Sequence, residues 1–204
     1  MKRRGTAGNG PAGNGRRPGR SPTRPARTRV RRAAAVVLLL VLLAFAIVTD
    51  RVFIHPRLAP LPPRVDAIIE LGGEGMAGRD RLALELAREH RAPVLVQSTV
   101  VQEAGTSRCL AAVPGVTVLC FHADPNTTRG EAHYIAAEAA RRNWTSIVLV
   151  TTPDQAWRAR LRTMRCFGGA VYVATSHLPA PRWLRQIPYQ WAATAKALTV
   201  ERAC

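Results

Sequence analysis

A glycine-rich segment, residues 72–78, lies between an apolar run and a helical pattern. Its glycines include the G-x-G-x-x-G spacing of a dinucleotide-binding turn. The acidic residue that such a site needs at the end of the second strand is missing, because Gln97 and Ser98 stand there. Two interpretations remain, a plain tight turn and a looser site where backbone N–H groups approach an anion at a helix N-terminus. The candidate binding residues here are Gly72, Gly73, Glu74, Gly75 and Arg81.

A second loop, residues 124–131, carries polar side chains before another helical pattern. Asn126 or Thr127 can cap that helix, and Glu131 suits a capping box. Capping leaves Asp124, Asn126 and Arg129 unexplained, so we include this loop in the candidate site.

A third loop, residues 151–158, places Pro153 at the first position of a helix, with Thr152 as its natural N-cap. Arg158, one turn into the helix, is expected to point at the same cleft, or else to form an exposed basic face with Arg162. The candidate ligand-binding residues of the second and third loops are Asp124, Asn126, Thr127, Thr152, Gln155 and Arg158.

The elements that must position these loops alternate between apolar runs and helical patterns. This alternation predicts an α/β fold, a single Rossmann-like domain with a mostly parallel five-stranded sheet, preceded by one transmembrane helix. Ligands bind such sheets at the carboxyl ends of the strands, so we expect the three loops to converge, with Arg81 and Arg158 facing the cleft. Strands are predicted at 65–71, 93–98, 116–121, 146–151 and 170–175, and helices at 79–90, 107–112, 127–142, 154–167 and 183–200.

The N-terminal third of the chain predicts a membrane anchor. Residues 1–32 form a low-complexity tail with eleven Lys and Arg and no acid, which we expect to be disordered. Residues 33–54 form an apolar transmembrane signal-anchor, and residues 55–64 a proline-rich linker to the domain at 65–204. The positive-inside rule places the tail in the cytoplasm and the domain outside a cell membrane crossed once. The alternative is a signal peptide cleaved after Ala46.

The charge distribution decides which partners are expected. The chain has a net charge of +17, of which the tail supplies +11 and the remainder +6. Because the positive-inside rule explains the tail, we expect it to contact anionic lipid headgroups and not nucleic acid. The mildly basic domain suits an anionic small-molecule or lipid-linked ligand. The sequence identifies no cofactor.

Four cysteines lie in the domain, on the oxidising side of the predicted membrane. Their spacing favours two disulfides, Cys109 with Cys120 and Cys166 with Cys204, and free buried thiols are the alternative. We predict no metal site, because no cysteine–histidine cluster has metal-ligand spacing.

Several of these segments together resemble the YdcF-like family of envelope proteins, also called SanA-like, in its actinobacterial-type variant. The resemblance covers about residues 65–173. It is carried by residues 66–73 (DAIIELGG), Arg81 before an Ala/Leu helix, Asn126-Thr127, residues 150–152 (VTT) and Arg158-Ala159.

The resemblance implies a membrane-anchored extracytoplasmic protein that binds or processes an anionic, phosphorylated cell-envelope precursor. Gln155 stands where the family has a histidine, and an amide does not titrate near neutrality. A catalytic role would then pass to Asp124, Asp154 or His177, so whether the protein is an enzyme stays open. The alternatives are a non-catalytic module for an anionic ligand and a structural envelope protein.

Overall fold

A computed structural model describes residues 24–73, 76–99 and 112–204 of the 204-residue chain. The chain divides into two compact units between Leu43 and Ala44.

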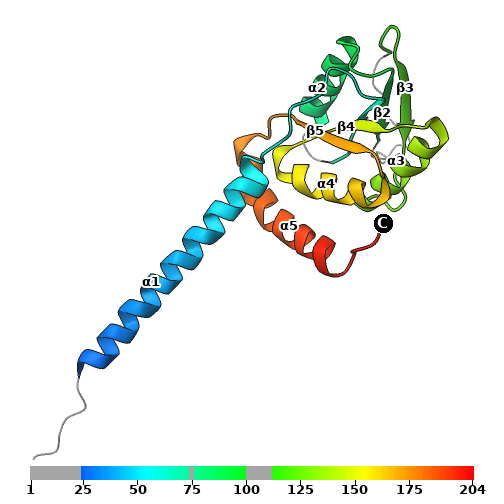
Figure 1. Ribbon diagram of the computed structural model, residues 1–204. Helices are drawn as coiled ribbons and strands as arrows, with labels where there is room; N and C mark the ends of the chain where they lie inside the picture. Colours follow the sequence, from blue (N-terminus) through cyan, green and yellow to red (C-terminus); the bar gives the residue numbers. More distant parts are fainter. Residues whose placement is uncertain (1–23, 74–75, 100–111) are drawn as a thin grey trace, which may run out of the picture. The chain divides into compact units, whose positions relative to one another are not determined.

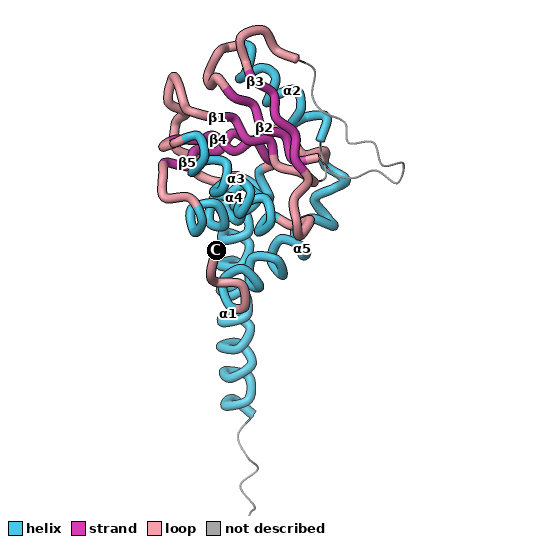
Figure 2. The backbone as a smooth tube through the Cα atoms, turned by 90° about the vertical axis from the view of Figure 1, so that its right-hand side faces the viewer, coloured by secondary structure: helices cyan, strands magenta, loops and turns pink. Residues whose placement is uncertain are grey.

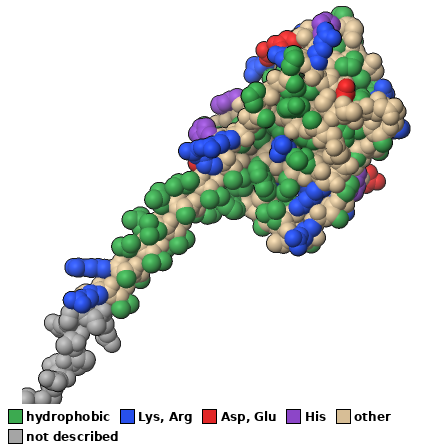
Figure 3. Space-filling model, in the orientation of Figure 1, with side chains coloured by type: hydrophobic (Ala, Val, Ile, Leu, Met, Phe, Trp, Pro, Cys, Tyr) green, Lys and Arg blue, Asp and Glu red, His purple; other side chains and the backbone are tan. Residues whose placement is uncertain are grey.

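The described residues of the N-terminal unit, 24–43, all belong to helix α1 (Arg24–Thr49). The last six residues of α1 and the π-helical turn that follows it, η1 (Asp50–Ile54), belong to the C-terminal unit. The large apolar side chains of α1 from Val36 to Val48 are 44–65% exposed, and Figure 3 shows them along the length of the helix. The stretch Thr28–Ile54 has a mean hydropathy of 2.7 and is long enough to cross a membrane. By length and composition it can serve as a membrane anchor or a signal sequence.

The start of α1 corrects one expectation. Residues 24–32 were expected to belong to a disordered tail, but the helix begins at Arg24. Arginine and alanine are good helix formers, and extending an existing helix avoids the cost of a new nucleus. Residues 1–23 lie outside the described residues.

The C-terminal unit contains one sheet of five parallel strands in the order β3-β2-β1-β4-β5 (Figure 1). The α/β fold with a parallel five-stranded sheet is therefore confirmed. Connections reverse direction across the neighbouring strands β1 and β4, which makes this pair the switch point where such sheets bind ligands. The strands are β1 (Ala67–Glu70), β2 (Val94–Ser98), β3 (Thr117–Phe121), β4 (Ser146–Thr151) and β5 (Ala170–Thr175).

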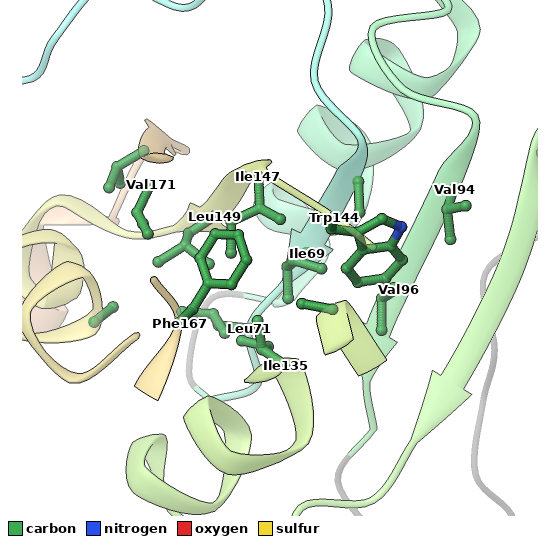
Figure 4. Close-up of a cluster of buried hydrophobic side chains, with 14 of the residues drawn as sticks. Ile69, Leu71, Val94, Val96, Ile135, Trp144, Ile147, Leu149, Phe167 and Val171 are labelled. Atoms are coloured by element: carbon green, nitrogen blue, oxygen red, sulfur yellow. The ribbon is translucent and has the colours of Figure 1, made fainter. Parts of the chain in front are cut away.

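Helices cover both faces of the sheet, with α2 on one side and α3 and α4 on the other (Figures 1 and 2). Successive residues of β1 serve the two faces, since Ile68 packs toward α2 and Ile69 toward α3 and α4. Figure 4 shows the core on the side of α3 and α4, which includes Ile69 of β1, Ile135 of α3 and Leu149 of β4. The helices are α2 (Met76–Arg88), α3 (Thr128–Arg142), α4 (Pro153–Cys166) and α5 (Ala180–Thr199).

Two contacts attach the periphery of this unit. Trp191 of α5 stacks on Phe45 at 5.1 Å between ring centroids, meets Phe53 edge-on, and donates its indole N–H to Thr49. The disulfide Cys166–Cys204 joins the end of α4 to the segment after α5, as predicted. Cys109 lies outside the described residues, as does most of the predicted helix 107–112, so the pairing of Cys109 with Cys120 stays a prediction.

Candidate functional site

A pocket of about 380 Å³ opens at the carboxyl ends of β1 and β4, beside the N-termini of α3 and α4. Four basic and two acidic side chains line it, so its charge balance is positive. Its lining residues are Gly72, Gly73, Asn126, Thr127, Thr128, Arg129, Glu131, Gln155, Arg158, Arg162, Tyr189, Ala193, Lys196 and Glu201.

The turn after β1 brings backbone close to charged side chains. Gly72 donates its N–H to Glu131 Oε1 at 2.7 Å. Gly73 has φ = 115°, in the region that favours glycine, and a side chain there would contact Arg79 and Gln155 at 3.4 Å. The close approach of the turn to these side chains therefore requires glycine at position 73.

Arg79 holds this turn against the start of α4. Its guanidinium donates to the carbonyl oxygens of Leu71 (2.8 Å) and Gly72 and to Thr152 Oγ1 (2.9 Å). The residue is fully buried, and burial lowers the pKa of the guanidinium, an effect that the carboxyl groups of Glu131 and Asp154 oppose. Arg79 thus supports the pocket from behind.

Glu131 lies on the first turns of α3 and faces the glycine turn. Burial raises the pKa of its carboxyl group, while the N–H of Gly72, the Ser98 hydroxyl and the charges of Arg79 and Arg158 oppose the shift. It does not form the predicted capping box, because its carboxylate reaches Gly72 on another segment. Thr127 is the N-cap, as expected, and its hydroxyl accepts from Gly130 N at 3.2 Å.

Arg158 lies in the pocket wall between α3 and α5. It is only 8% exposed, and burial lowers the pKa of its guanidinium. Its Nε donates to Gln190 Oε1 at 3.1 Å and its Nη1 to Thr128 Oγ1 at 2.8 Å. Among the described residues no carboxylate forms a salt bridge with Arg158, and these two hydrogen bonds go to neutral acceptors. The carboxyl groups of Glu131 and Asp154 act on its charge only from a greater distance and oppose the lowering of its pKa.

The outer wall comes from α5 and the segment after it. Glu201 forms ion pairs with Arg162 of α4 and with Lys196 of α5, the latter at 2.8 Å. The nearby disulfide between Cys166 and Cys204 holds the same segment against α4.

Six of the predicted binding residues converge on this pocket from three segments. They are Gly72, Gly73, Asn126, Thr127, Gln155 and Arg158. Thr152 is buried and does not line the pocket, but its hydroxyl accepts a hydrogen bond from Arg79. Asp124 is exposed and also does not line the pocket. Glu74 and Gly75 lie outside the described residues.

The expectation that Arg81 faces the cleft is wrong. Arg81 is exposed on α2 and is absent from the pocket lining, whereas Arg79 points at the glycine turn. Residues two apart on a helix project in nearly opposite directions, so only one of the two arginines can face the sheet. The alternative of an exposed basic face formed by Arg158 and Arg162 is also wrong, because both residues are buried.

Sequence reasoning also missed several pocket residues. The contact of Glu131 with Gly72 was missed because a capping box already explained a glutamate at this position. Arg79 could have been considered beside Arg81, since both are arginines at the start of the same helix. Nothing in the local sequence of α5 indicates that Tyr189 and Lys196 reach the pocket.

No histidine is among the described residues that line this pocket, and His177 is exposed elsewhere. One group of possible metal ligands, His133, Cys166 and Cys204, lies within 4.8 Å, but both cysteines are joined in the disulfide. The site therefore offers backbone N–H groups, guanidinium groups and one buried carboxyl group, a set that suits a phosphate or carboxylate ligand. Comparisons with protein-family models, with curated proteins and with solved structures find no match.

Proposed function

We propose that this chain is a membrane-anchored protein whose extracytoplasmic domain binds an anionic, phosphate-bearing molecule of the cell envelope. The observation that carries the proposal is Arg158, a buried cation at a pocket with four basic and two acidic lining residues, which forms no salt bridge with a carboxylate in the described part of the chain. An arginine held by neutral acceptors keeps its charge available for a ligand.

The anchor and the envelope location rest on separate support. The exposed apolar helix Thr28–Ile54 supports an anchor, and the basic residues before it favour a cytoplasmic N-terminus. The resemblance to YdcF-like and SanA-like proteins favours an envelope ligand. A tether would hold the pocket close to lipid-linked molecules.

One observation favours processing of the ligand as a second candidate function. Glu131 is buried with a raised pKa, the property that a general acid needs near neutrality. Gln155 favours binding alone, because it takes the place where the family has a histidine and offers no proton to transfer.

The binding proposal is tested with pyrophosphate and the full chain in neutral detergent. Arg158→Lys keeps the charge but loses the forked geometry, and should weaken pyrophosphate binding by roughly 1.5–3 kcal/mol in a calorimetric titration. Lys196→Gln, on the exposed wall, should weaken it about two- to fivefold. Arg81→Lys is the matched control, since Arg81 is exposed and lies outside the lining.

Equal pyrophosphate affinity in wild type, Arg158→Lys and Lys196→Gln would contradict the proposal, provided that circular dichroism shows folded variants.

The orientation in the membrane is tested separately with a phosphatase reporter fused after residue 204. This reporter should be active because it lies outside the cytoplasm. If only a reporter that works in the cytoplasm were active at the same position, the proposed topology would be wrong.

A further inference from the structure

A second pocket lies beside the end of the apolar helix, within the unit Ala44–Cys204, and we name it the juxtamembrane pocket. Its volume is about 710 Å³. Helix α1, η1, the linker, α4 and β5 all contribute to it. Its lining residues are Ile47, Arg51, Val52, Pro56, Arg57, Leu58, Ala59, Ala156, Trp157, Arg160, Val171, Tyr172 and Val173.

One wall of the juxtamembrane pocket is apolar and incompletely covered by protein. Trp157 is 38% exposed and Leu58 36% exposed, while Val171 and Val173 connect the wall to the domain core. Ile47 belongs to this wall and is itself 52% exposed. The wall therefore includes exposed apolar surface of the kind that suits hydrocarbon chains.

The polar part of the same pocket is cationic. Arg51, Arg57 and Arg160 are charged lining residues, and no acidic residue is among the described residues that line it. Arg51 Nε lies 3.6 Å from Oδ2 of Asp50, a residue that does not line the pocket. Arg160 Nε donates to the carbonyl oxygen of Val171. Arg57 is exposed and has no hydrogen bond or ion pair with another described residue. Guanidinium groups that line one pocket are the side chains best suited to a phosphate ligand.

A count of residues along the apolar stretch puts the end of a membrane span near this pocket. A helix needs about 20 residues to cross the hydrocarbon. Counted from Ala33, which follows the basic pair Arg31-Arg32, such a length ends near Val52. Ile47 and Val52 line the pocket, so its apolar wall would begin in the hydrocarbon and its arginines would lie among the phosphates.

We propose that the juxtamembrane pocket binds an anionic phospholipid of the surrounding bilayer. The arginines hold the lipid phosphate, and the wall of Ile47, Leu58 and Trp157 receives the upper part of an acyl chain. This inference rests on the anchor in the proposed function but not on the anion pocket at Arg158.

The experiment uses the full chain in a neutral detergent, titrated with phosphatidylglycerol or with phosphatidylcholine of the same acyl chains. Native mass spectrometry counts the bound lipid. Arg57→Gln/Arg160→Gln removes two charges from the pocket, and Arg81→Gln/Arg88→Gln removes two exposed charges from α2 as the matched control. Ala59→Trp leaves the charges intact but fills the pocket.

Wild type and the α2 control should retain phosphatidylglycerol in preference to phosphatidylcholine. The pocket variant should lose about fivefold in affinity for each arginine, and Ala59→Trp should also lose retention. The proposal would be overturned if wild type retained both lipids equally. It would also be overturned if the pocket variant retained as much phosphatidylglycerol as the α2 control variant. So would retention of a polyprenyl phosphate but not of phosphatidylglycerol.

The anchor is tested separately by washing membranes with alkaline carbonate. Release of the protein by this wash would contradict the anchor, whereas the lipid titration in detergent tests the pocket alone. Pyrophosphate binding at Arg158 should be unchanged in the Arg57→Gln/Arg160→Gln variant, because neither arginine lines that pocket.

Discussion

Glu131 is one of the two acidic residues that an anion in the Arg158 pocket would meet, and the buried one. Its carboxyl group accepts from Gly72 N at 2.7 Å and is 6% exposed, and burial raises its pKa. Protonation removes this charge while the backbone contact can persist. Binding of an anion should therefore strengthen as pH falls toward and through the pKa of Glu131.

Glu131→Gln should reproduce the protonated state at neutral pH, because the amide oxygen can still accept from Gly72 N. We expect pyrophosphate to bind the variant several-fold more tightly than wild type, with a smaller dependence on pH. Calorimetric titrations across pH 5–8 measure both effects. Weaker binding by the variant at every pH would show that the carboxylate contacts the ligand favourably or supports the turn.

Glu70 is a second buried carboxyl group, at the end of β1 on the side of α2. Gln97 Nε2 donates to its Oε2 at 3.2 Å. Burial raises the pKa of Glu70 to about 9, with a further increase from Asp80 and a decrease from Arg79 and Gln97. Between the unfolded pKa of 4.5 and about 9, the folded protein keeps a proton that the unfolded chain releases. Stability should therefore fall as pH rises through this window.

Glu70→Gln removes the titration and should flatten this pH dependence. At pH 8 we expect the variant to be more stable than wild type by about 1–3 kcal/mol, and at pH 4 nearly equal to it. Urea unfolding at several pH values tests this expectation. Glu85→Gln, at an exposed position on α2, is the control and should leave the pH dependence unchanged.

At the scale of elements, the strands were more predictable than the site. Strands β4 and β5 match the predicted ranges 146–151 and 170–175 because parallel strands buried on both faces are short, continuous apolar runs. Helix α4 was predictable at its start because Pro153 and Thr152 have local roles.

The direction of an arginine near a helix start was less predictable. Arg79 and Arg81 both belong to the first turns of α2, and the sequence alone does not give the rotation of the helix on the sheet. Glu131 shows the same limit, because a local pattern explained it before its partner Gly72 was known.

The N-terminus of α3 depends on a close contact at Gly130. A Cβ added there would overlap the carbonyl oxygen of Pro125 and approach the carbonyl carbon of Asp124 at 3.0 Å. The loop carrying Asn126 and Thr127 would have to shift, and that loop lines the anion pocket.

Gly130→Ala should therefore lower the free energy of unfolding by about 1–3 kcal/mol, despite the better helix propensity of alanine. Gly168→Ala is the matched control, since nothing lies within 4 Å of its added Cβ. Urea unfolding should show a change within about 0.5 kcal/mol for this control. A Gly130→Ala variant as stable as wild type would mean that the loop shifts without lowering the free energy of unfolding.

At the scale of the whole molecule, the pocket depends on segments far apart in the chain. Gln190 of α5 accepts from Arg158 and donates to Asp154 Oδ2 at 2.8 Å, and Glu201 ties Arg162 to Lys196. Local sequence patterns predicted that α5 exists but carried no information about which face of the domain it covers. The disulfide between Cys166 and Cys204 was the one sequence feature that indicated where this segment returns.

Removing that disulfide should act on both stability and binding. Cys166 and Cys204 are separated by 38 residues, and opening a loop of this length should lower the free energy of unfolding by about 2–4 kcal/mol. The segment with Glu201 would also be held less firmly, so pyrophosphate affinity at the Arg158 pocket should decrease in Cys166→Ser/Cys204→Ser. Urea unfolding under non-reducing conditions and calorimetric titration measure the two effects. Unchanged unfolding in the double variant would show that the ion pairs of Glu201 hold the wall without the disulfide. Unchanged affinity would show that pyrophosphate binding does not depend on the disulfide.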